Sequence, residues 1–284
     1  MSKFVIFTDS GCDISEEVLQ SWSINCQYLT FRFNDAETEY AGNAMPAKEF
    51  YDKMRAGGIA KTAAVNVDQF ANTFKTALDA GKDVLYIGLS SGISNTYNAG
   101  RLAAQQLREE YPDRKIVAFD SLTASAGHGL VLYLAAQKRD EGSSLEETVA
   151  YLEEIRPSVA AWFTVEDLVY LKRGGRVSAT TALVGNALGI KPVMHVDDEG
   201  KLIKVTTAHG RRKSLAMLAA KYKETAKTPG EGPVFISHGD CREDAEILAK
   251  MLGTEVQLIT YVSPVIGAHS GPGTVALFFI AKER

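Results

Sequence analysis

The sequence predicts an α/β protein with two domains: an N-terminal α/β/α domain built on a parallel sheet, and a C-terminal α+β domain with a mixed or antiparallel sheet. In the first half, short apolar runs alternate with amphipathic helical patterns, and this order is typical of parallel βαβ units. After Gly174-Gly175 the pattern changes, because two apolar segments flank the turn sequence Asp197-Asp198-Glu199-Gly200 and predict a β-hairpin. We therefore place the domains at residues 1–165 and 166–284.

The predicted strands are apolar runs rich in β-branched or aromatic residues. In chain order they are 4–7, 24–33, 84–89, 116–119, 159–165, 190–196, 202–207, 234–238, 256–262 and 274–281. Several helices begin at recognisable start signals, which are Asp13 with Glu16, Pro46, Asn66 with Gln69, and Ser144 with Glu147. Further helical patterns cover residues 214–226 and 241–252.

Composition and charge exclude several functions. The chain has 284 residues and a formal net charge of -4. A nucleic-acid binder usually presents a basic face. The tight basic runs here, Lys172-Arg173 and Arg211-Arg212-Lys213, are typical of solvated helix ends, so we expect no nucleic-acid partner.

We also expect no membrane span and no signal peptide. The longest apolar run, near Val275 to Ala281, is far below the roughly 20 residues that cross a membrane. The apolar run at the N-terminus stops at Asp9, which is too early for a signal-peptide core. Cys12, Cys26 and Cys241 lack metal or redox spacing, which predicts free thiols, no metal site and a cytoplasmic location.

A polar loop, Ser90 to Tyr97, follows the strand 84–89 and opens a helix. Ligands bind beyond the carboxyl ends of parallel strands, and the free N–H groups of a helix start attract anions. Hydroxyls of Ser94 and Thr96 would add neutral hydrogen bonds to a carboxylate or phosphate. Since Ser94 is equally well explained as a helix cap, the loop alone leaves both interpretations open.

The same loop contains G-x-S-x-G at Gly88 to Gly92, which is the spacing of the nucleophile elbow of α/β-hydrolases. In that motif a helix begins directly after the serine, whereas Gly92 and Asn95 predict a longer loop here. A serine hydrolase or esterase that uses Ser90 is therefore the alternative function.

Two glycine-containing stretches lie in the second half. His269-Ser270-Gly271-Pro272-Gly273 is expected to form a loop in which His269 can touch a ligand, although a turn histidine bonded to backbone is the ordinary explanation. Arg173-Gly174-Gly175-Arg176 reads as a helix stop. The chain has neither a Walker loop nor a strand-linked G-x-G-x-x-G, so we expect no nucleotide cofactor.

Taken together, these segments resemble the DegV family of bacterial fatty-acid-binding proteins, which serve a fatty acid kinase. The resemblance covers essentially the whole chain and rests on Thr8-Asp9-Ser10, Ser90-Ser91-Gly92-Ile93-Ser94, Phe163-x-Val165, Leu168-x-x-Leu171-x-Arg173-Gly174-Gly175-Arg176, Lys191-Pro192 and His269-x-Gly271-Pro272-Gly273. It implies a two-domain α/β architecture with one long-chain fatty acid buried between the domains. It also implies a carrier that performs no catalysis and presents the carboxylate to the kinase, which forms an acyl phosphate for phospholipid synthesis.

The resemblance also assigns roles to residues. It implies that Thr62, Ser94 and His269 bind the carboxylate. The loops of the ligand site would include Ser91, Gly92, Gly271 and Gly273. Arg173 and Arg176, which flank the Gly-Gly pair, are the expected docking surface for the kinase.

The chain departs from the family's pattern after Lys61. Members commonly have Thr-Ser-Gln-Pro there, whereas this sequence has Thr62-Ala63-Ala64-Val65, and Asn95 replaces a frequent glycine after Ser94.

Overall fold

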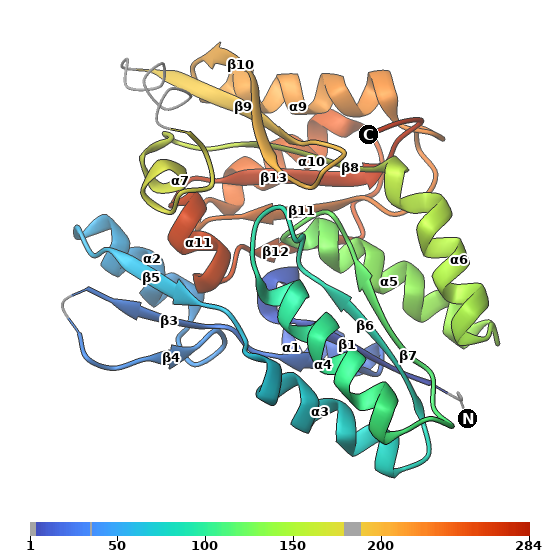
Figure 1. Ribbon diagram of the computed structural model, residues 1–284. Coiled ribbons are helices and arrows are strands. Elements are labelled where there is room, and N and C mark those ends of the chain that lie inside the picture. The colour runs from blue at the N-terminus through green and yellow to red at the C-terminus, as the bar shows by residue number, and fades with distance from the viewer. Residues whose placement is uncertain (1–3, 35, 179–188) are drawn as a thin grey trace.

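The computed structural model describes residues 4–34, 36–178 and 189–284, and its strands form three sheets (Figure 1). A four-stranded sheet with the order β2-β1-β6-β7 is parallel throughout. A six-stranded sheet with the order β10-β9-β8-β13-β11-β12 is mixed, since only β11 and β12 run parallel. A small antiparallel sheet has the order β4-β3-β5. The predicted fold class is therefore confirmed.

The strands are β1 (Phe4–Asp9), β2 (Ile24–Gln27), β3 (Thr30–Phe33), β4 (Tyr40–Ala41), β5 (Ala60–Ala63), β6 (Asp83–Gly88), β7 (Ile116–Asp120), β8 (Val159–Thr164), β9 (Ile190–Val196), β10 (Leu202–His209), β11 (Phe235–His238), β12 (Leu258–Tyr261) and β13 (Val275–Ile280). The helices are α1 (Glu16–Ser21), α2 (Ala47–Arg55), α3 (Val67–Asp79), α4 (Thr96–Glu110), α5 (Ala126–Asp140), α6 (Leu145–Ile155), α7 (Val169–Arg173), α9 (Arg211–Thr225), α10 (Arg242–Leu252) and α11 (Pro264–Ser270), with 3₁₀ turns η1 (Ser10–Cys12) and η2 (Arg156–Ser158). None of the helices within the described ranges is both long and apolar enough to cross a membrane.

The parallel sheet is covered on one face by α3 and α4. Phe70 and Phe74 of α3 pack against Tyr86 of β6, with ring centroids 4.7 Å and 5.7 Å apart. The capping boxes predicted at Asn66 and Ser144 both form, and they fix the starts of α3 and α6.

Two details of the first half differ from the prediction. The run 24–33 is not one strand, because β2 joins the parallel sheet while β3 belongs to the small sheet. Between them the amide of Leu29 donates to Ser10 Oγ at 3.0 Å, which turns the chain from one sheet to the other. Asp13 does not start α1; Ser15 caps it, and Asp13 is buried with a φ of 53°.

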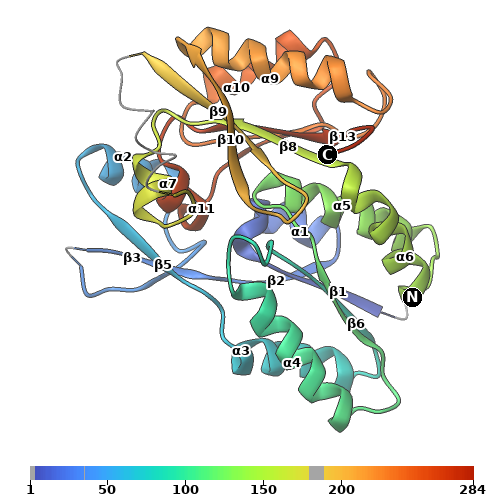
Figure 2. The same ribbon diagram turned by 45° about the horizontal axis from the view of Figure 1, so that its top comes forward.

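Helix α5 lies between the two large sheets (Figure 2). One side of it shares a core with β1 and β6, and the other contacts β8, β11 and β13. Up to Ala136 its residues are therefore buried all around the helix, apart from the half-buried Tyr133, as expected for a segment without a solvent-facing side. In the last turn, Gln137 and Asp140 are exposed. The opposite face of the six-stranded sheet is covered by α9 and α10.

The predicted hairpin after residue 189 forms as β9 and β10, which pair in antiparallel register with a bulge between Lys204 and Thr206. Sheet membership changes along the chain between β7 and β8, because β8 is hydrogen-bonded to β9 and β13. The division of the domains at residue 165 stays a prediction.

The small sheet and α2 form a separate layer against α11. The hydroxyl of Tyr51 in α2 donates to the carbonyl of Val262 at 2.9 Å, just before α11 begins. Arg55 at the end of α2 forms an ion pair with Asp240. This layer carries Thr62 on β5 toward the second half of the chain.

Candidate functional site

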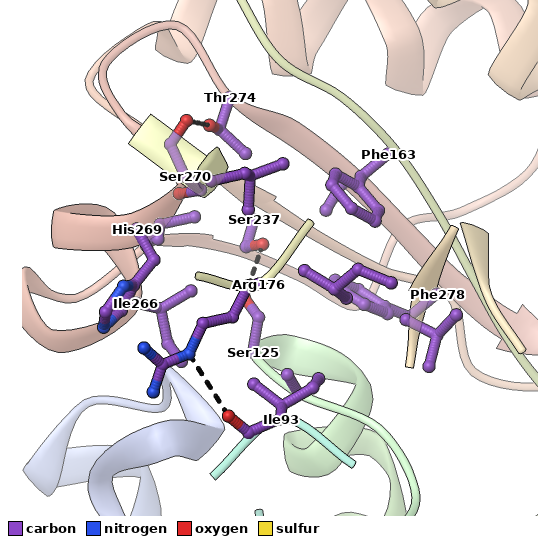
Figure 3. Close-up of a pocket in the computed structure, with 16 residues that line it drawn as sticks. Ile93, Ser125, Phe163, Arg176, Ser237, Ile266, His269, Ser270, Thr274 and Phe278 are labelled. Carbon is purple, nitrogen blue, oxygen red and sulfur yellow. Dashed lines mark hydrogen bonds between the residues drawn. The ribbon is translucent and has the colours of Figure 1, made fainter. Parts of the chain in front are cut away.

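An apolar pocket lies where the start of α5, the six-stranded sheet and α11 meet (Figure 3). Its cavity volume is about 70 Å³, well below the roughly 300–1,000 Å³ common for small-molecule sites, so a ligand of that size fits only if the lining side chains move apart. Its lining residues are Ile93, Ala124, Ser125, Phe163, Leu171, Arg176, Val196, Leu202, Ser237, Val262, Ile266, His269, Ser270, Thr274, Ala276 and Phe278. Figure 3 shows Arg176 and His269 on one side, and Phe163 and Phe278 on the other.

His269 occupies the last turn of α11, so the prediction that it lies in a loop is wrong. Its Nε2 shares a hydrogen bond with Thr62 Oγ1 at 2.9 Å, which joins the small sheet to the pocket. Burial, and then the nearby charge of Arg176, lower the pKa of His269 to about 4. The imidazole is therefore neutral near pH 7, and it can serve as one hydrogen-bond donor and one acceptor.

The His269 ring depends on a close approach by Gly174. A Cβ atom on Gly174 would lie 2.2 Å from His269 Nδ1, so a larger residue would displace the ring. The same Nδ1 is buried without a hydrogen-bond partner in the described structure. The Gly-Gly pair is thus more than a helix stop, because its first glycine makes room for the histidine.

Arg176 is placed differently from the exposed docking position expected for it. It is partly buried and lines the pocket, where its Nε donates to the carbonyl of Ile93 at 3.2 Å and its Nη1 donates to the carbonyl of Gly174. Burial lowers its pKa from the ordinary value, but a guanidinium stays charged in proteins. Arg173, by contrast, is exposed and stacks on Tyr170. The segment Arg173-Gly174-Gly175-Arg176 thus supplies one cation to the pocket and one to the surface.

Ser94 lies beside this arrangement rather than within it. Its Oγ shares a hydrogen bond with Thr96 Oγ1 at 2.9 Å and accepts from the Thr96 amide at 3.2 Å. Its neighbour Ile93 lines the pocket. The structure therefore brings Thr62 and His269 together and puts Ser94 on the adjoining segment, where its hydroxyl supports the start of α4.

The fold explains why glycine stands at three positions of the expected ligand loops. A Cβ atom on Gly92 would lie 2.7 Å from the carbonyl oxygen of Glu199, because the tip of the β9–β10 hairpin rests on this loop. Gly271 and Gly273 have φ values of 81° and 79°, which favour glycine. Ser91 is exposed, and its amide donates to the Asp120 carboxylate at 3.2 Å.

The geometry contradicts the hydrolase alternative. Ser90 is completely buried, and its hydroxyl donates to the carbonyl of Gly200 at 2.8 Å while accepting from the Gly92 amide. Helix α4 begins at Thr96 rather than directly after the serine. Ser90 therefore holds the hairpin tip, and it is not an exposed nucleophile.

No sequence motif predicts the polar network that lies on the pocket wall. Ser125 donates to the Asp13 carboxylate and shares a hydrogen bond of 2.8 Å with Ser237. The other carboxylate oxygen of Asp13 accepts from the Ser263 amide, the residue before α11, at 3.0 Å. Burial raises the pKa of Asp13 to about 7, although these hydrogen bonds oppose the change. Ser125 has a φ of 55° and a ψ of -147°, a strained backbone for a non-glycine residue.

The fold and the pocket thus define an α/β protein with an internal apolar pocket that ends at a histidine and an arginine. A model of the DegV family of uncharacterised proteins matches residues 3–282. The chain belongs to the DegV family. A DegV domain-containing protein of Clostridium perfringens is 41% identical over 291 residues, which cover 100% of this chain and 99% of the relative.

Solved structures show the same architecture. The DegV lipid-binding protein of Thermotoga maritima has 28% identity and a TM-score of 0.85, and the alignment covers 99% of each chain. A stearic acid-binding protein of Eubacterium ventriosum has 25% identity and a TM-score of 0.88, with 98% of each chain covered. DegV of Bacillus subtilis, a fatty acid-binding protein, has 26% identity and a TM-score of 0.84, with 99% of this chain and 100% of that chain covered.

Proposed function

We propose that the chain binds one long-chain fatty acid in the apolar pocket, with the carboxylate at the end formed by Thr62, His269 and Arg176. The observation that carries this proposal is the distribution of polarity, since apolar walls end at a guanidinium and an imidazole. A fatty acid has the same distribution, an acyl chain with one anion at its end. The lipid, stearic acid and fatty acid binding of the three structural relatives supports this ligand class.

The energetics assign separate roles to the tail and the head. An acyl chain of about 16 carbons buries about 15 methylene or methyl groups, which is on the order of 12 kcal/mol of gross burial free energy. One hydrogen bond to a charged group contributes about 1.5–3 kcal/mol. The tail therefore dominates affinity, while the head-group residues set the position of the carboxylate.

Each head-group residue has a distinct task in this proposal. Arg176 supplies the positive charge, and its anchors at Ile93 and Gly174 hold it in place. Neutral His269 carries one N–H. When this N–H, on Nε2, donates to Thr62 Oγ1, the Thr62 hydroxyl is left to donate its own hydrogen bond to the carboxylate. Ser94 reaches the same anion when its hydroxyl turns away from Thr96.

We further propose that the protein is a cytoplasmic carrier without catalysis of its own, which presents the carboxylate to a fatty acid kinase. A surface groove supports this step, because it shares Ile93, Arg176 and Leu202 with the pocket. A carboxylate at Arg176 would lie next to that groove, where a second enzyme can approach.

The ligand is tested by organic extraction of the purified protein and mass spectrometry, which should detect a near-stoichiometric C14–C18 fatty acid.

The role of Arg176 is tested by titrating delipidated protein with fatty acid. The titration compares Arg176→Gln with Arg173→Gln, a matched control because Arg173 is exposed. We expect Arg176→Gln to weaken binding by roughly ten- to a hundredfold, from one charged hydrogen bond, and Arg173→Gln to leave it unchanged. If neither extracted nor added fatty acid is found on the protein, the proposal fails.

A further inference from the structure

Two serine hydroxyls with spare hydrogen-bonding capacity interrupt the apolar lining of the pocket. Ser237 lies on β11 and Ser270 is the last residue of α11, and the two residues are 0% and 7% exposed. Their elements meet at the start of β13, because Ser237 pairs with Ala276 and the Thr274 hydroxyl donates to the carbonyl of Ser270 at 3.0 Å. Figure 3 draws both serines among the residues that line the pocket.

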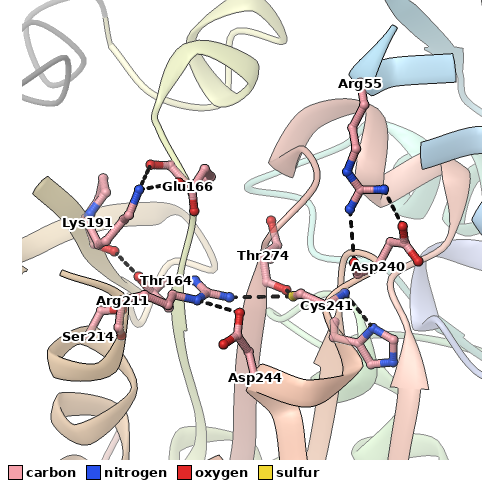
Figure 4. Close-up of polar contacts among 12 residues, drawn as sticks. Arg55, Thr164, Glu166, Lys191, Arg211, Ser214, Asp240, Cys241, Asp244 and Thr274 are labelled. Carbon is pink, nitrogen blue, oxygen red and sulfur yellow. Dashed lines mark hydrogen bonds and ion pairs between the residues drawn. The ribbon is translucent and has the colours of Figure 1, made fainter. Parts of the chain in front are cut away.

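The hydroxyl of Ser270 is buried and has no hydrogen-bond partner among the described residues. Its backbone is held in place, because the Thr274 hydroxyl binds its carbonyl and Thr274 is itself fixed. The carbonyl of Thr274 accepts from the Gly239 amide at 2.8 Å and from the Cys241 thiol at 3.2 Å (Figure 4). A buried hydroxyl without a partner is costly and calls for an explanation, which a polar group of the ligand supplies.

The hydroxyl of Ser237 is free to accept but not to donate. Ser125 uses its one hydroxyl hydrogen on the Asp13 carboxylate, so Ser237 is the donor in the 2.8 Å hydrogen bond between the two serines. A ligand group that binds Ser237 must therefore be a donor, whereas Ser270 can donate to the same group. A hydroxyl group meets both conditions, because it donates one hydrogen bond and accepts others.

We propose that Ser237 and Ser270 bind a hydroxyl group on the acyl chain, so that the pocket selects a hydroxy fatty acid. The ligand hydroxyl donates to Ser237 Oγ and accepts from Ser270 Oγ, which leaves none of the three hydroxyls unpartnered. An unsubstituted acyl chain would instead cover both serines with methylene groups. The selectivity rests on the proposed binding of a fatty acid and narrows the class of that ligand.

The remaining lining restricts the hydroxyl to one position along the chain. The Thr274 hydroxyl already donates to the carbonyls of Ser270 and Gly271, at 3.0 Å and 2.8 Å. Elsewhere the acyl chain would meet apolar side chains such as Phe163 and Phe278. A hydroxyl on another carbon would therefore be buried without partners, so the pocket should distinguish positional isomers.

The wild type tests this selectivity without any substitution. Delipidated protein is titrated with stearate and with the stearates that carry one hydroxyl group, moved carbon by carbon along the chain. We expect one isomer to bind at least as tightly as stearate, and the others to bind roughly ten- to a hundredfold more weakly because their hydroxyl is buried unpaired. The titration is made at pH 8, since burial raises the pKa of Asp13 to about 7 and its carboxylate is then ionised.

Alanine variants then assign the preference to the two serines. Ser237→Ala and Ser270→Ala should each weaken binding of the preferred hydroxystearate about tenfold and leave the affinity for stearate unchanged. The matched control is Ser214→Ala, which removes a buried hydroxyl of α9 on the opposite face of the six-stranded sheet (Figure 4). This control should change neither affinity.

Two results would overturn the selectivity. If stearate binds more tightly than every hydroxystearate, or if the preference persists in both alanine variants, Ser237 and Ser270 recognise no hydroxyl group. Either result leaves the binding of a fatty acid intact. If neither stearate nor any hydroxystearate binds, the proposed function fails and the selectivity fails with it.

Discussion

Loss of the His269 or Ser94 side chain should lower the rate of phosphoryl transfer rather than the affinity for fatty acid. Because the acyl chain supplies most of the burial free energy, His269→Ala and Ser94→Ala should each retain bound fatty acid. Phosphoryl transfer needs the carboxylate oxygen in line with the donor phosphate, and a small misplacement costs a hundredfold or so in rate. We therefore expect acyl-phosphate formation by the cognate kinase to fall about a hundredfold, measured beside bound lipid. Unchanged rates in both variants would place the carboxylate elsewhere.

Asp13 should make stability depend on pH. Its native pKa is raised from 3.8 to about 7, so the folded protein keeps a proton that the unfolded chain loses. The contribution of this proton to the free energy of unfolding is fully present below about pH 4, and it is lost as the pH rises to about 7. Relative to the wild type, Asp13→Asn should gain on the order of 1 kcal/mol in free energy of unfolding per pH unit between pH 5 and 7.

Urea unfolding at several pH values measures this difference. The depressed pKa of His269 acts in the opposite direction, because a group that resists protonation when folded gains stability as the pH rises from 4 to 6.5. Both proteins carry His269, so its effect cancels in the comparison. Asp113→Asn, an exposed control, should show no such trend. Parallel pH profiles for Asp13→Asn and the wild type would count against the assignment.

At the scale of elements, the β9–β10 hairpin is fastened to the first half through Ser90. Ser90→Ala leaves the buried carbonyl of Gly200 without its donor, so the free energy of unfolding should fall by about 1–3 kcal/mol. Ser91→Ala, at an exposed neighbouring position, should change it little. The wild type, Ser90→Ala and Ser91→Ala should all lack ester hydrolysis. Stable labelling of Ser90 by a fluorophosphonate, lost in Ser90→Ala together with ester turnover, would revive the hydrolase.

Elements with a strong periodic pattern were predictable from the sequence. The runs at β1, β6, β7 and β8 and the capping boxes at Asn66 and Ser144 have local causes, and the structure contains them. The small sheet was not predictable, because β4 and β5 are short and gain their pairing only from contact with β3. The helical position of His269 depends in the same way on packing of α11 against the small sheet.

The site was predictable only where the residues match a family pattern. The contact between Thr62 and His269 joins positions 207 residues apart, which no local signal specifies. Arg176 and Arg173 look alike in sequence, and only the turn at Gly174-Gly175 sends one to the pocket and the other to the surface. The link between Asp13 and Ser125 likewise exists only after α5 packs against η1.

At the scale of the whole molecule, the exposed Arg173 stays our candidate for docking of the kinase. Surface charges mainly change association rates, so Arg173→Glu should slow association with the kinase at low salt and leave fatty acid affinity intact. Surface plasmon resonance measures both rate constants. Lys172→Glu, at an exposed neighbouring position, reports whether the effect belongs to one residue or to net charge. An association rate equal to that of the wild type would refute the assignment.

The placement of α5 between the two large sheets makes them a single cooperative unit. Neither sheet can lose its core without exposing one side of this helix, so calorimetry should record one transition rather than two. The amides of α5 should exchange with deuterium only through global opening and should be among the slowest in the chain. Expressed alone, residues 1–165 would expose the side of α5 that normally meets β11 and β13, and we expect that fragment to aggregate.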